Sequence, residues 1–265
     1  MTDEIVPSLG DMVRDLSGQD GRIAARISPH WMQGRTAFGG ITAALALAAT
    51  RKALPELPAL RSMQVSFLRP ISEEVEFKVE LIRAGRSSSF VQVDCISADK
   101  LGARCTFVFG GPRESAYTHD YLADQNVPGP DDSPQLIRRS SGPSFFKNFE
   151  ARLADGAQLA SGSDRPEMIV WTRLAARDDV DPEIAFICNA DNLPPAAMAT
   201  FTAGAPVSTI TWALDVARMP TDNDWQVTRT TSKHSADGYS VQDMEIRSRD
   251  GMLLASAQQL VALFA

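Results

Sequence analysis

The longest apolar run in the chain predicts a helix of an uncommon kind. Residues 38–54, FGGITAALALAATRKAL, open with a phenylalanine and two glycines, and between Ile41 and Ala49 only Thr42 is not apolar. Apolar residues therefore lie on every side of the predicted helix instead of along one stripe, which is typical of a helix enclosed by protein. We expect this helix to fill the centre of a fold.

The segments around this helix have the pattern of β-strands. GRIAARIS (residues 21–28) precedes the helix as a short strand, and longer segments follow it. The longer segments are rich in β-branched and aromatic residues, alternate partly between apolar and polar positions, and are separated by turn residues. We expect an antiparallel meander made of residues 62–70, 74–87, 89–102 and 103–110.

The same order of elements returns in the second half of the chain. A strand-like segment at residues 145–156 is followed by a second predicted helix at residues 181–192, with Asp181 as N-cap and Pro182 in its first turn. Strand-like segments then continue to Phe264. Positions that are 149 residues apart can be paired between the halves: Phe90 with Tyr239, Gly102 with Gly251, and Arg69 with Arg218.

Repetition on this scale predicts two similar folds in tandem. The expected fold class is α+β, a tandem or double hot dog in which each antiparallel sheet wraps around a central apolar helix. Residues 114–134 are rich in Pro, Ser and Asp and have no periodicity. We therefore divide the chain into an N-terminal domain (residues 1–110), a linker (111–143) and a C-terminal domain (144–265).

Composition excludes several classes of protein. Of the 265 residues, 44% are apolar and 22% charged, as in ordinary soluble proteins. A net charge of −7 argues against broad nucleic-acid binding. No apolar run reaches the roughly 20 residues that span a bilayer, and no secretory signal is visible. We expect a cytoplasmic protein whose three cysteines, Cys95, Cys105 and Cys188, are buried thiols.

Asp191 is an acidic residue at the end of the otherwise apolar second predicted helix. Ile184, Ile187, Cys188 and Asp191 share one helix face, so that the carboxylate lies on an apolar stripe. Burial and the negative end of the helix dipole would both raise the pKa of Asp191, which suits a base acting near neutrality. The spacing alone equally permits a polar helix end with Asp191 turned to solvent.

Gln259 stands out in the same way on the last predicted strand. Every second residue from Leu253 to Leu263 is apolar except Gln259, and a buried amide needs hydrogen-bond partners. Alternatively, this face is partly exposed or marks a sheet edge. Gly39 and Gly40 can allow close packing at the start of the first helix. They can also offer backbone N–H groups to a substrate carbonyl, and the two interpretations are compatible.

Several short motifs carry a family resemblance. FGG at residues 38–40, SFLRP at 66–70, DNL at 191–193, STI at 208–210 and DGMLLASAQQ at 250–259 resemble type II acyl-CoA thioesterases of the TesB-like class. The resemblance runs from about Arg22 to Phe264, apart from the linker. It implies that Asp191, Thr209 and Gln259 orient a hydrolytic water, with Thr211 or Ser208 as alternatives to Thr209.

The resemblance implies acyl-CoA hydrolysis by direct attack of water. Neither a G-x-S-x-G motif nor a nucleotide fingerprint is present, and the three scattered histidines predict no metal site. We expect no cofactor, and an oxyanion site at Phe38, Gly39 and Gly40. Two alternatives stay open: hydration or dehydration of an acyl-CoA, with His30 as the histidine nearest the first helix, and acyl-CoA binding without catalysis.

Two further expectations concern ligand contacts and assembly. Four arginines are candidates for the phosphates of CoA: Arg83, Arg86, Arg229 and Arg247. The residues packing around the acyl chain are expected to include Phe38, Met63, Phe67, Trp171 and Met198. Residues 252–264 are apolar enough for burial on both faces, which, with the family resemblance, favours a homodimer.

Overall fold

The computed structural model describes residues 6–122, 126–137 and 142–265. The N-terminal half contains the helices α1 (Leu9–Arg14) and α2 (Gly39–Ala53), the short 3-10 helix η1 (Pro29–Trp31), and a small hairpin of β3 (Met32–Gln33) and β4 (Thr36–Ala37). Its longer strands are β1 (Ser17–Gln19), β2 (Arg22–Arg26), β5 (Leu60–Phe67), β6 (Glu74–Ala84), β7 (Ser89–Ser97) and β8 (Lys100–Phe109).

The C-terminal half repeats this plan with a shorter central helix. Its helices are η2 (Ser144–Asn148), α3 (Pro182–Asn189) and η3 (Ala196–Ala199). Its strands are β9 (Phe149–Gly156), β10 (Glu167–Leu174), β11 (Val207–Val216), β12 (Gln226–Ala236), β13 (Tyr239–Ser248) and β14 (Leu253–Leu263).

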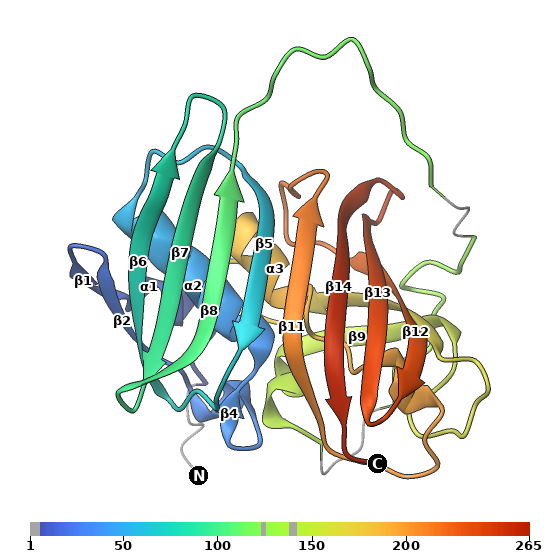
Figure 1. Ribbon diagram of the computed structural model, residues 1–265. Helices are drawn as coiled ribbons and strands as arrows, with labels where there is room; N and C mark the ends of the chain where they lie inside the picture. Colours follow the sequence, from blue (N-terminus) through green and yellow to red (C-terminus); the bar gives the residue numbers. More distant parts are fainter. Residues whose placement is uncertain (1–5, 123–125, 138–141) are drawn as a thin grey trace.

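One continuous sheet runs through both halves. Within the described residues its strand order is β1-β2-β6-β7-β8-β5-β11-β14-β13-β12-β10-β9, and the paired strands are antiparallel. β5 and β11 join the halves, with Met63 opposite Leu214 and Val65 opposite Trp212. Figure 1 shows α2 behind the strands of the N-terminal half and α3 next to it, behind the junction of β5 and β11. The predicted α+β double hot dog is confirmed.

Helix α2 is enclosed as its sequence predicts. Every residue from Gly40 to Thr50 is buried. The hydroxyls of Thr42 and Thr50 donate to the carbonyl oxygens of Phe38 (3.2 Å) and Ala46 (2.9 Å). These bonds satisfy the polar atoms of the buried threonines, since an unpaired buried hydroxyl is costly. The helix therefore fills its half of the sheet with almost no polar mismatch.

The interiors of the two halves differ in polarity. Inward residues of β6, β7 and β8, such as Phe77, Val91 and Phe107, are apolar and buried. Six inner positions of β12 and β13 are instead polar and buried, beside the apolar Met244 and Ile246: Gln226, Thr228, Thr230, Ser232, Ser240 and Gln242. The two halves share the fold, but the second interior offers polar side chains to the end of α3 and to the segment that follows it.

Strand β10 packs against the end of the predicted linker. The sequence pattern predicted neither this strand nor its contact with the linker. β10 is buried along both faces. On one face Met168 packs in a cluster with Leu136, and on the other the indole of Trp171 donates to the carbonyl oxygen of Pro128 (2.8 Å). Because both faces are covered, β10 shows no apolar–polar alternation. The division at residues 111 and 143 stays a prediction, and residues 123–125 and 138–141 lie outside the described part.

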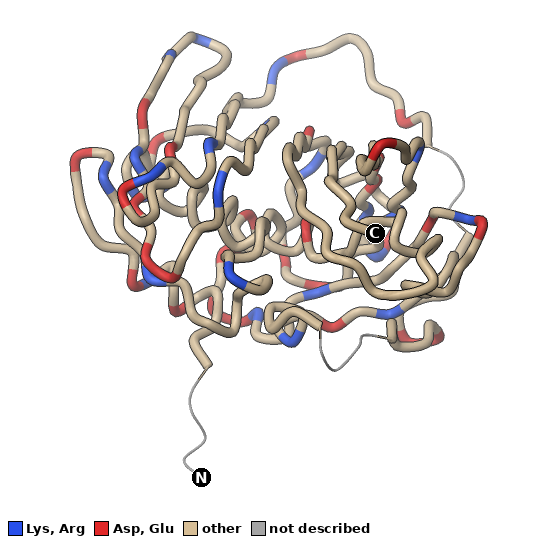
Figure 2. The backbone as a smooth tube through the Cα atoms, turned by 60° about the horizontal axis from the view of Figure 1, so that its bottom comes forward, with Lys and Arg blue, Asp and Glu red and all other residues tan. Residues whose placement is uncertain are grey.

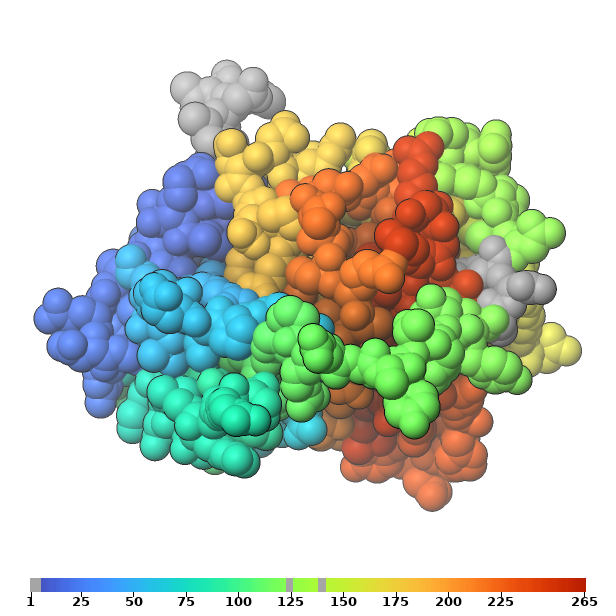
Figure 3. Space-filling view, turned by 90° about the horizontal axis from the view of Figure 1, so that it is seen from above, coloured from blue at the N-terminus to red at the C-terminus, as the bar shows by residue number. Residues whose placement is uncertain are grey.

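The rest of the predicted linker runs over the surface. Residues 111–122 form no helix or strand, and Tyr117 and Tyr121 are almost fully exposed. Figure 3 shows this segment in green, crossing from the N-terminal half onto the C-terminal half.

The separation of 149 residues between equivalent positions holds just after β5 and β11 but not at the last strand of each half. The backbone N–H groups of Leu68 and Arg69 both donate to the carbonyl oxygen of Gly102, and those of Ala217 and Arg218 both donate to that of Leu254. The pairing of Arg69 with Arg218 therefore describes equivalent positions. The pairing of Gly102 with Gly251 does not, because Gly251 lies in the turn before β14 and Leu254 occupies the matching place.

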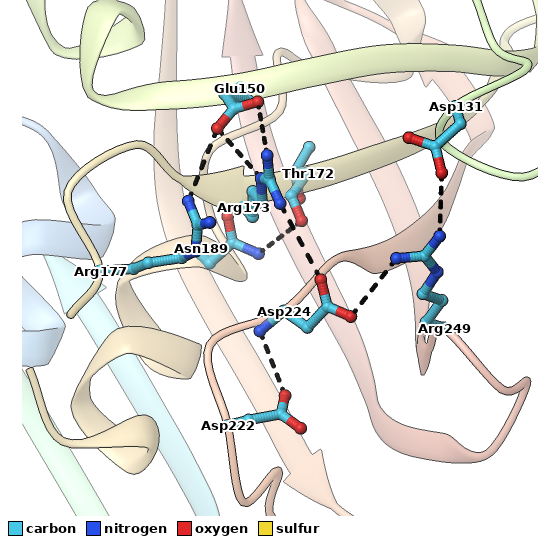
Figure 4. Close-up of polar contacts among 9 residues, drawn as sticks. All are labelled: Asp131, Glu150, Thr172, Arg173, Arg177, Asn189, Asp222, Asp224 and Arg249. Atoms are coloured by element: carbon cyan, nitrogen blue, oxygen red, sulfur yellow. Dashed lines mark hydrogen bonds and ion pairs between the residues drawn. The ribbon is translucent and has the colours of Figure 1, made fainter.

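Ion pairs link the outer strands of the C-terminal half to the linker end. Arg173 lies 3.0 Å from Glu150 and 4.0 Å from Asp224, and Arg249 joins Asp224 (3.7 Å) to Asp131 (3.0 Å). Figure 4 shows this chain of contacts. Such partly exposed pairs stabilise a fold only slightly, but they occupy these arginines. Figure 2 shows basic and acidic residues interspersed over the backbone.

Cys95, Cys105 and Cys188 are buried free thiols, as predicted. Among the described helices, none is long and apolar enough to cross a membrane.

Candidate active site

The start of α2 and the end of α3 meet where the two halves join. A Cβ atom on Gly40 would lie 2.5 Å from the carbonyl oxygen of Cys188, and a Cβ on Gly39 would lie 2.5 Å from Oδ2 of Asp191. Only glycine allows so close an approach of one helix to the other. The positive end of the α2 dipole therefore faces the negative end of α3, an arrangement that stabilises both helix ends.

Asp191 follows α3 directly and turns toward this junction. The helix ends at Asn189 with Ala190 as its C-cap, so Asp191 lies just beyond the last turn. Its Oδ1 atom accepts a hydrogen bond from Nε2 of Gln259 at 2.6 Å. The residue is partly exposed, but it opens onto a cavity between protein elements. The alternative of a carboxylate pointing away from the protein is wrong.

The surroundings of Asp191 favour its protonated form. Burial raises the pKa of Asp191 from 3.8 to about 7, although the hydrogen bonds from Gln259 and from the backbone N–H of Gly40 act in the opposite direction. The sequence predicted the effect of burial. It did not foresee that the N-terminus of α2 would supply an N–H group that favours the charged form, against the dipole of α3.

Gln259 is held on the inner face of β14. Its side chain is buried, with the residue 7% exposed, and its strand neighbours are Trp212 on β11 and Gln242 on β13. The amide group can therefore reach Asp191 but not bulk solvent. The prediction of a buried glutamine on an apolar face is confirmed.

A β-bulge decides which hydroxyl of β11 faces inward. Thr209 lies opposite the fully buried Val261, while Thr211 lies opposite Leu260, one residue earlier on β14. The register shift between them places the two threonines on opposite faces of the sheet. Thr209 lines the cavity at Asp191, Ser208 lies at its rim and is exposed, and Thr211 is exposed and outside it.

The cavity beside Asp191 has a volume of about 240 Å³. It is bounded by the β3–β4 hairpin, the start of α2, the segment after β5 and the start of β11. Its lining residues include Thr36, Gly39, Phe67, Arg69, Asp191 and Thr209. Within the described lining, Asp191 is the single carboxylate and Arg69 the single cation. The site is thus built from both halves of the chain.

Two asparagines hold Asp191 in place, and the sequence analysis did not identify them. Nδ2 of Asn192 donates to Oδ1 of Asn189 (2.6 Å), and Nδ2 of Asn189 donates to Oε1 of Gln226 (2.9 Å). Both asparagines are buried. Their signal was present in the run CNADN, where amides flank the acid at the end of an apolar helix. They fix the backbone on each side of Asp191 to β12.

Gln242 anchors the segment that follows. Its Oε1 atom accepts a hydrogen bond from the backbone N–H of Ala196 at 2.6 Å. The polar interior of the C-terminal half therefore binds the chain from Asn189 to Ala196 instead of leaving it loose. A base that must keep its distance to a water benefits from such support.

Other predicted residues lie away from the cavity. The N–H group of Phe38 donates to the carbonyl oxygen of Trp31 (3.1 Å), and the ring of Phe38 stacks on Phe145 at 4.2 Å, so Phe38 has no free donor for an oxyanion. Of the residues expected around an acyl chain, Phe67 lines the cavity, whereas Trp171 packs on the outer side of β10. His30 is not among the lining residues.

Two family models match the chain, one over each half. Residues 27–110 match the family described as acyl-CoA thioesterase N-terminal domain, and residues 122–263 match acyl-CoA thioesterase C-terminal domain. Acyl-CoA thioesterase 2 of Haemophilus influenzae is 26% identical over 249 residues, covering 85% of this chain and 86% of that protein.

Solved structures share the fold over nearly the full length. A conserved protein of unknown function with a hot dog fold from Alicyclobacillus acidocaldarius has a TM-score of 0.88 at 23% identity, covering 98% of this chain and 99% of that one. Acyl-CoA thioesterase II TesB2 from Mycobacterium marinum has a TM-score of 0.76 at 19% identity, covering 96% and 97%. These identities are too low to show more than the fold. The two family matches carry the assignment: the chain belongs to the TesB-like acyl-CoA thioesterase II family, a family of thioester hydrolases with the double hot-dog fold.

Proposed function

We propose that the protein hydrolyses acyl-CoA thioesters to a free fatty acid and CoA, with Asp191 as the base. The observation that carries this proposal is the carboxylate of Asp191, bonded to Gln259 at 2.6 Å and open to the cavity. A pKa near 7 leaves the group able both to accept and to return a proton close to neutrality.

The proposed reaction needs only water and the residues around the cavity. The Asp191 carboxylate takes a proton from a water as the water oxygen attacks the thioester carbonyl carbon. The carbonyl π electrons move to oxygen, and the backbone N–H of Gly39 at the start of α2 stabilises the resulting oxyanion. When the carbonyl re-forms, the carbon–sulfur bond breaks and the CoA sulfur leaves with the proton held by Asp191.

Gln259 and Thr209 have supporting roles in this proposal. The amide of Gln259 donates to one carboxylate oxygen, which orients Asp191 and leaves the second oxygen for the water. The hydroxyl of Thr209, on the same cavity wall, holds the water against the carbonyl. Gly40 is assigned to Asp191 rather than to the oxyanion, because its N–H group faces the carboxylate.

A panel of acyl-CoAs with a thiol-reactive dye tests the activity. We expect release of CoA for at least one chain length, and a fall of roughly 10²-fold or more in kcat for Gln259→Ala, the scale of losing support for a positioned acid–base group. Gln258→Ala is the matched control, since Gln258 points to the outer face and is exposed. Its turnover should match that of the unmodified protein.

Absence of CoA release with every ester would reject the proposal. Turnover of an enoyl-CoA followed by its absorbance would then favour hydration, and calorimetric binding of a CoA ester without turnover would favour a binding protein.

A further inference from the structure

CoA carries several phosphate charges, and this acidic protein must meet them with local cations. Ion pairing removes many arginines from consideration: Nε of Arg229 lies 3.5 Å from Glu167, and Nε of Arg247 donates to Glu245 at 2.7 Å. A guanidinium already paired with a carboxylate has less to offer a phosphate. Two of the four arginines predicted for CoA are therefore poor candidates.

Arg83 and Arg86 are unsuitable for a different reason. They lie at the β6–β7 turn, which Figure 1 shows at the end of the sheet opposite β4, and Thr36 of β4 lines the cavity. Arg83 is nine residues along β6 from Glu74, roughly 30 Å at about 3.3 Å per residue. A phosphate bound there would hold the thioester far from Asp191.

Arg69 has the position that the other arginines lack. It lines the cavity that contains Asp191, and it is exposed. Nη1 of Arg69 donates to the carbonyl oxygen of Leu101 at 3.1 Å, and the structure gives it no carboxylate partner within the described residues. Its backbone N–H bonds to Gly102 (2.9 Å), which fixes the base of the side chain while free N–H groups remain at its tip.

Arg35 lies on the neighbouring hairpin. Gln33 and Thr36 pair across the hairpin and both line the cavity, and Arg35 is exposed at its tip, after Gly34 with a φ of 67°. The hairpin is bonded to the segment after β5: Oγ1 of Thr36 accepts from the N–H of Ile71 at 3.0 Å. Arg35 and Arg69 are thus carried by two segments that are tied together at the cavity rim.

We propose that Arg69, with Arg35 on the adjoining hairpin, binds a phosphate of the CoA head and so fixes the end of the cavity from which the thioester reaches Asp191. The inference rests on the proposed function and deepens it. Neither guanidinium group has a carboxylate partner within the described residues, so both keep donors for phosphate oxygens. They also supply local positive charge that the negative net charge of the chain does not.

The test compares thioesters with and without the phosphates. For Arg69→Ala we expect kcat/KM to fall about 10- to 100-fold with acyl-CoA, as for loss of a hydrogen bond to a charged group, mostly through KM. With the same acyl group on N-acetylcysteamine, which has no phosphate, kcat/KM should not change. Arg69→Lys should recover part of the loss, and the acyl ester of dephospho-CoA shows whether the 3′-phosphate is the group bound.

Arg218→Ala is the matched control. Arg218 is the equivalent position of the repeat and is also exposed, but it is not among the residues that line the Asp191 cavity. An equal fall with acyl-CoA and the N-acetylcysteamine ester, or no fall with either, would overturn the inference. If neither ester is hydrolysed, the proposed function fails instead, and calorimetry with CoA still decides this inference: Arg69→Ala should weaken binding by a similar factor, and unchanged binding would reject it.

Discussion

The raised pKa of Asp191 predicts that this residue opposes folding stability while it serves catalysis. Its folded pKa of about 7 lies above the ordinary value of 3.8. The folded state therefore holds the proton more tightly than the unfolded state. Stability from this group is full below about pH 4, is lost progressively as the pH rises to 7, and stays low above that value.

The expected size follows from the shift. At about 1.4 kcal/mol per pKa unit, ionising Asp191 in the fold costs roughly 4 kcal/mol in total, of which about 3 kcal/mol appears between pH 5 and pH 8. Asp191→Asn keeps the shape of the protonated acid but cannot ionise. Its free energy of unfolding relative to the unmodified protein should therefore rise by about 3 kcal/mol over that range.

Urea unfolding of both proteins at pH 5 and pH 8 measures this difference, and CoA release measures activity. We expect Asp191→Asn to be the more stable protein at pH 8 and to lose roughly 10²-fold or more in kcat. The kcat of the unmodified protein should increase with pH up to about pH 7 and then level off, since the base must be ionised. A stability difference that is the same at both pH values would refute the raised pKa, and full activity in Asp191→Asn would refute its role as base.

Three other predictions follow from the site and the surface. Thr209→Val should lower kcat by about 10-fold or more while Thr211→Val leaves it unchanged; the reverse result in the same CoA-release assay would mean that the β11 register is wrong. Gly39→Ala should abolish turnover, because its Cβ would lie 2.5 Å from Oδ2 of Asp191, and retained activity would show that the helix start yields easily. We also expect a homodimer burying at least ~1,000 Å², with the exposed Val241 on the outer face of β13 in its interface. Light scattering should give about twice the 28.7 kDa of one chain, reduced toward one chain by Val241→Lys; a single-chain mass at all concentrations would exclude the dimer.

The surface of β14 also qualifies the reason for expecting that dimer. Ser256 and Gln258 are exposed on its outer face, so this strand is less apolar outside than the run of residues 252–264 suggested. The exposed apolar residues lie instead on β13, where Tyr239 and Val241 alternate with buried polar positions. The dimer stays a prediction, with its expected centre moved by one strand.

Sequence patterns predicted the helices and strands whose burial follows a simple rule, either buried on all sides or buried on one face. Helix α2 was recognisable because its apolar residues lie on all sides, and the meander strands because they alternate. β10 was missed because the end of the linker covers its outer face. Pro128 accepts a hydrogen bond from Trp171 on that outer face, and Leu136 packs with Met168 on the other face. Both residues come from a segment without periodicity, and no local pattern shows that such a segment will pack against the sheet.

The site divides in the same way between local and tertiary signals. Asp191 and Gln259 were identifiable as polar residues in apolar surroundings, and the structure brings them into contact. The inward face of Thr209 depends on a bulge that interrupts the alternation of β11. Two further features depend on how the two halves pack: the N–H of Gly40 faces Asp191, and Arg69 lines the same cavity. The sequence of one half alone does not predict this packing.

Because the two halves meet through the pairing of β5 with β11, the enzyme could be divided into two fragments that associate there. Gly39 and Arg69 come from one half, Asp191 and Gln259 from the other, and the described connection at residues 111–122 crosses the surface without joining the sheet. A chain cut in that connection would yield two fragments, each holding an incomplete set of reacting groups. The rate of thioester hydrolysis would then be proportional to the concentration of paired fragments. That rate would therefore measure the affinity of the two sheet edges for each other.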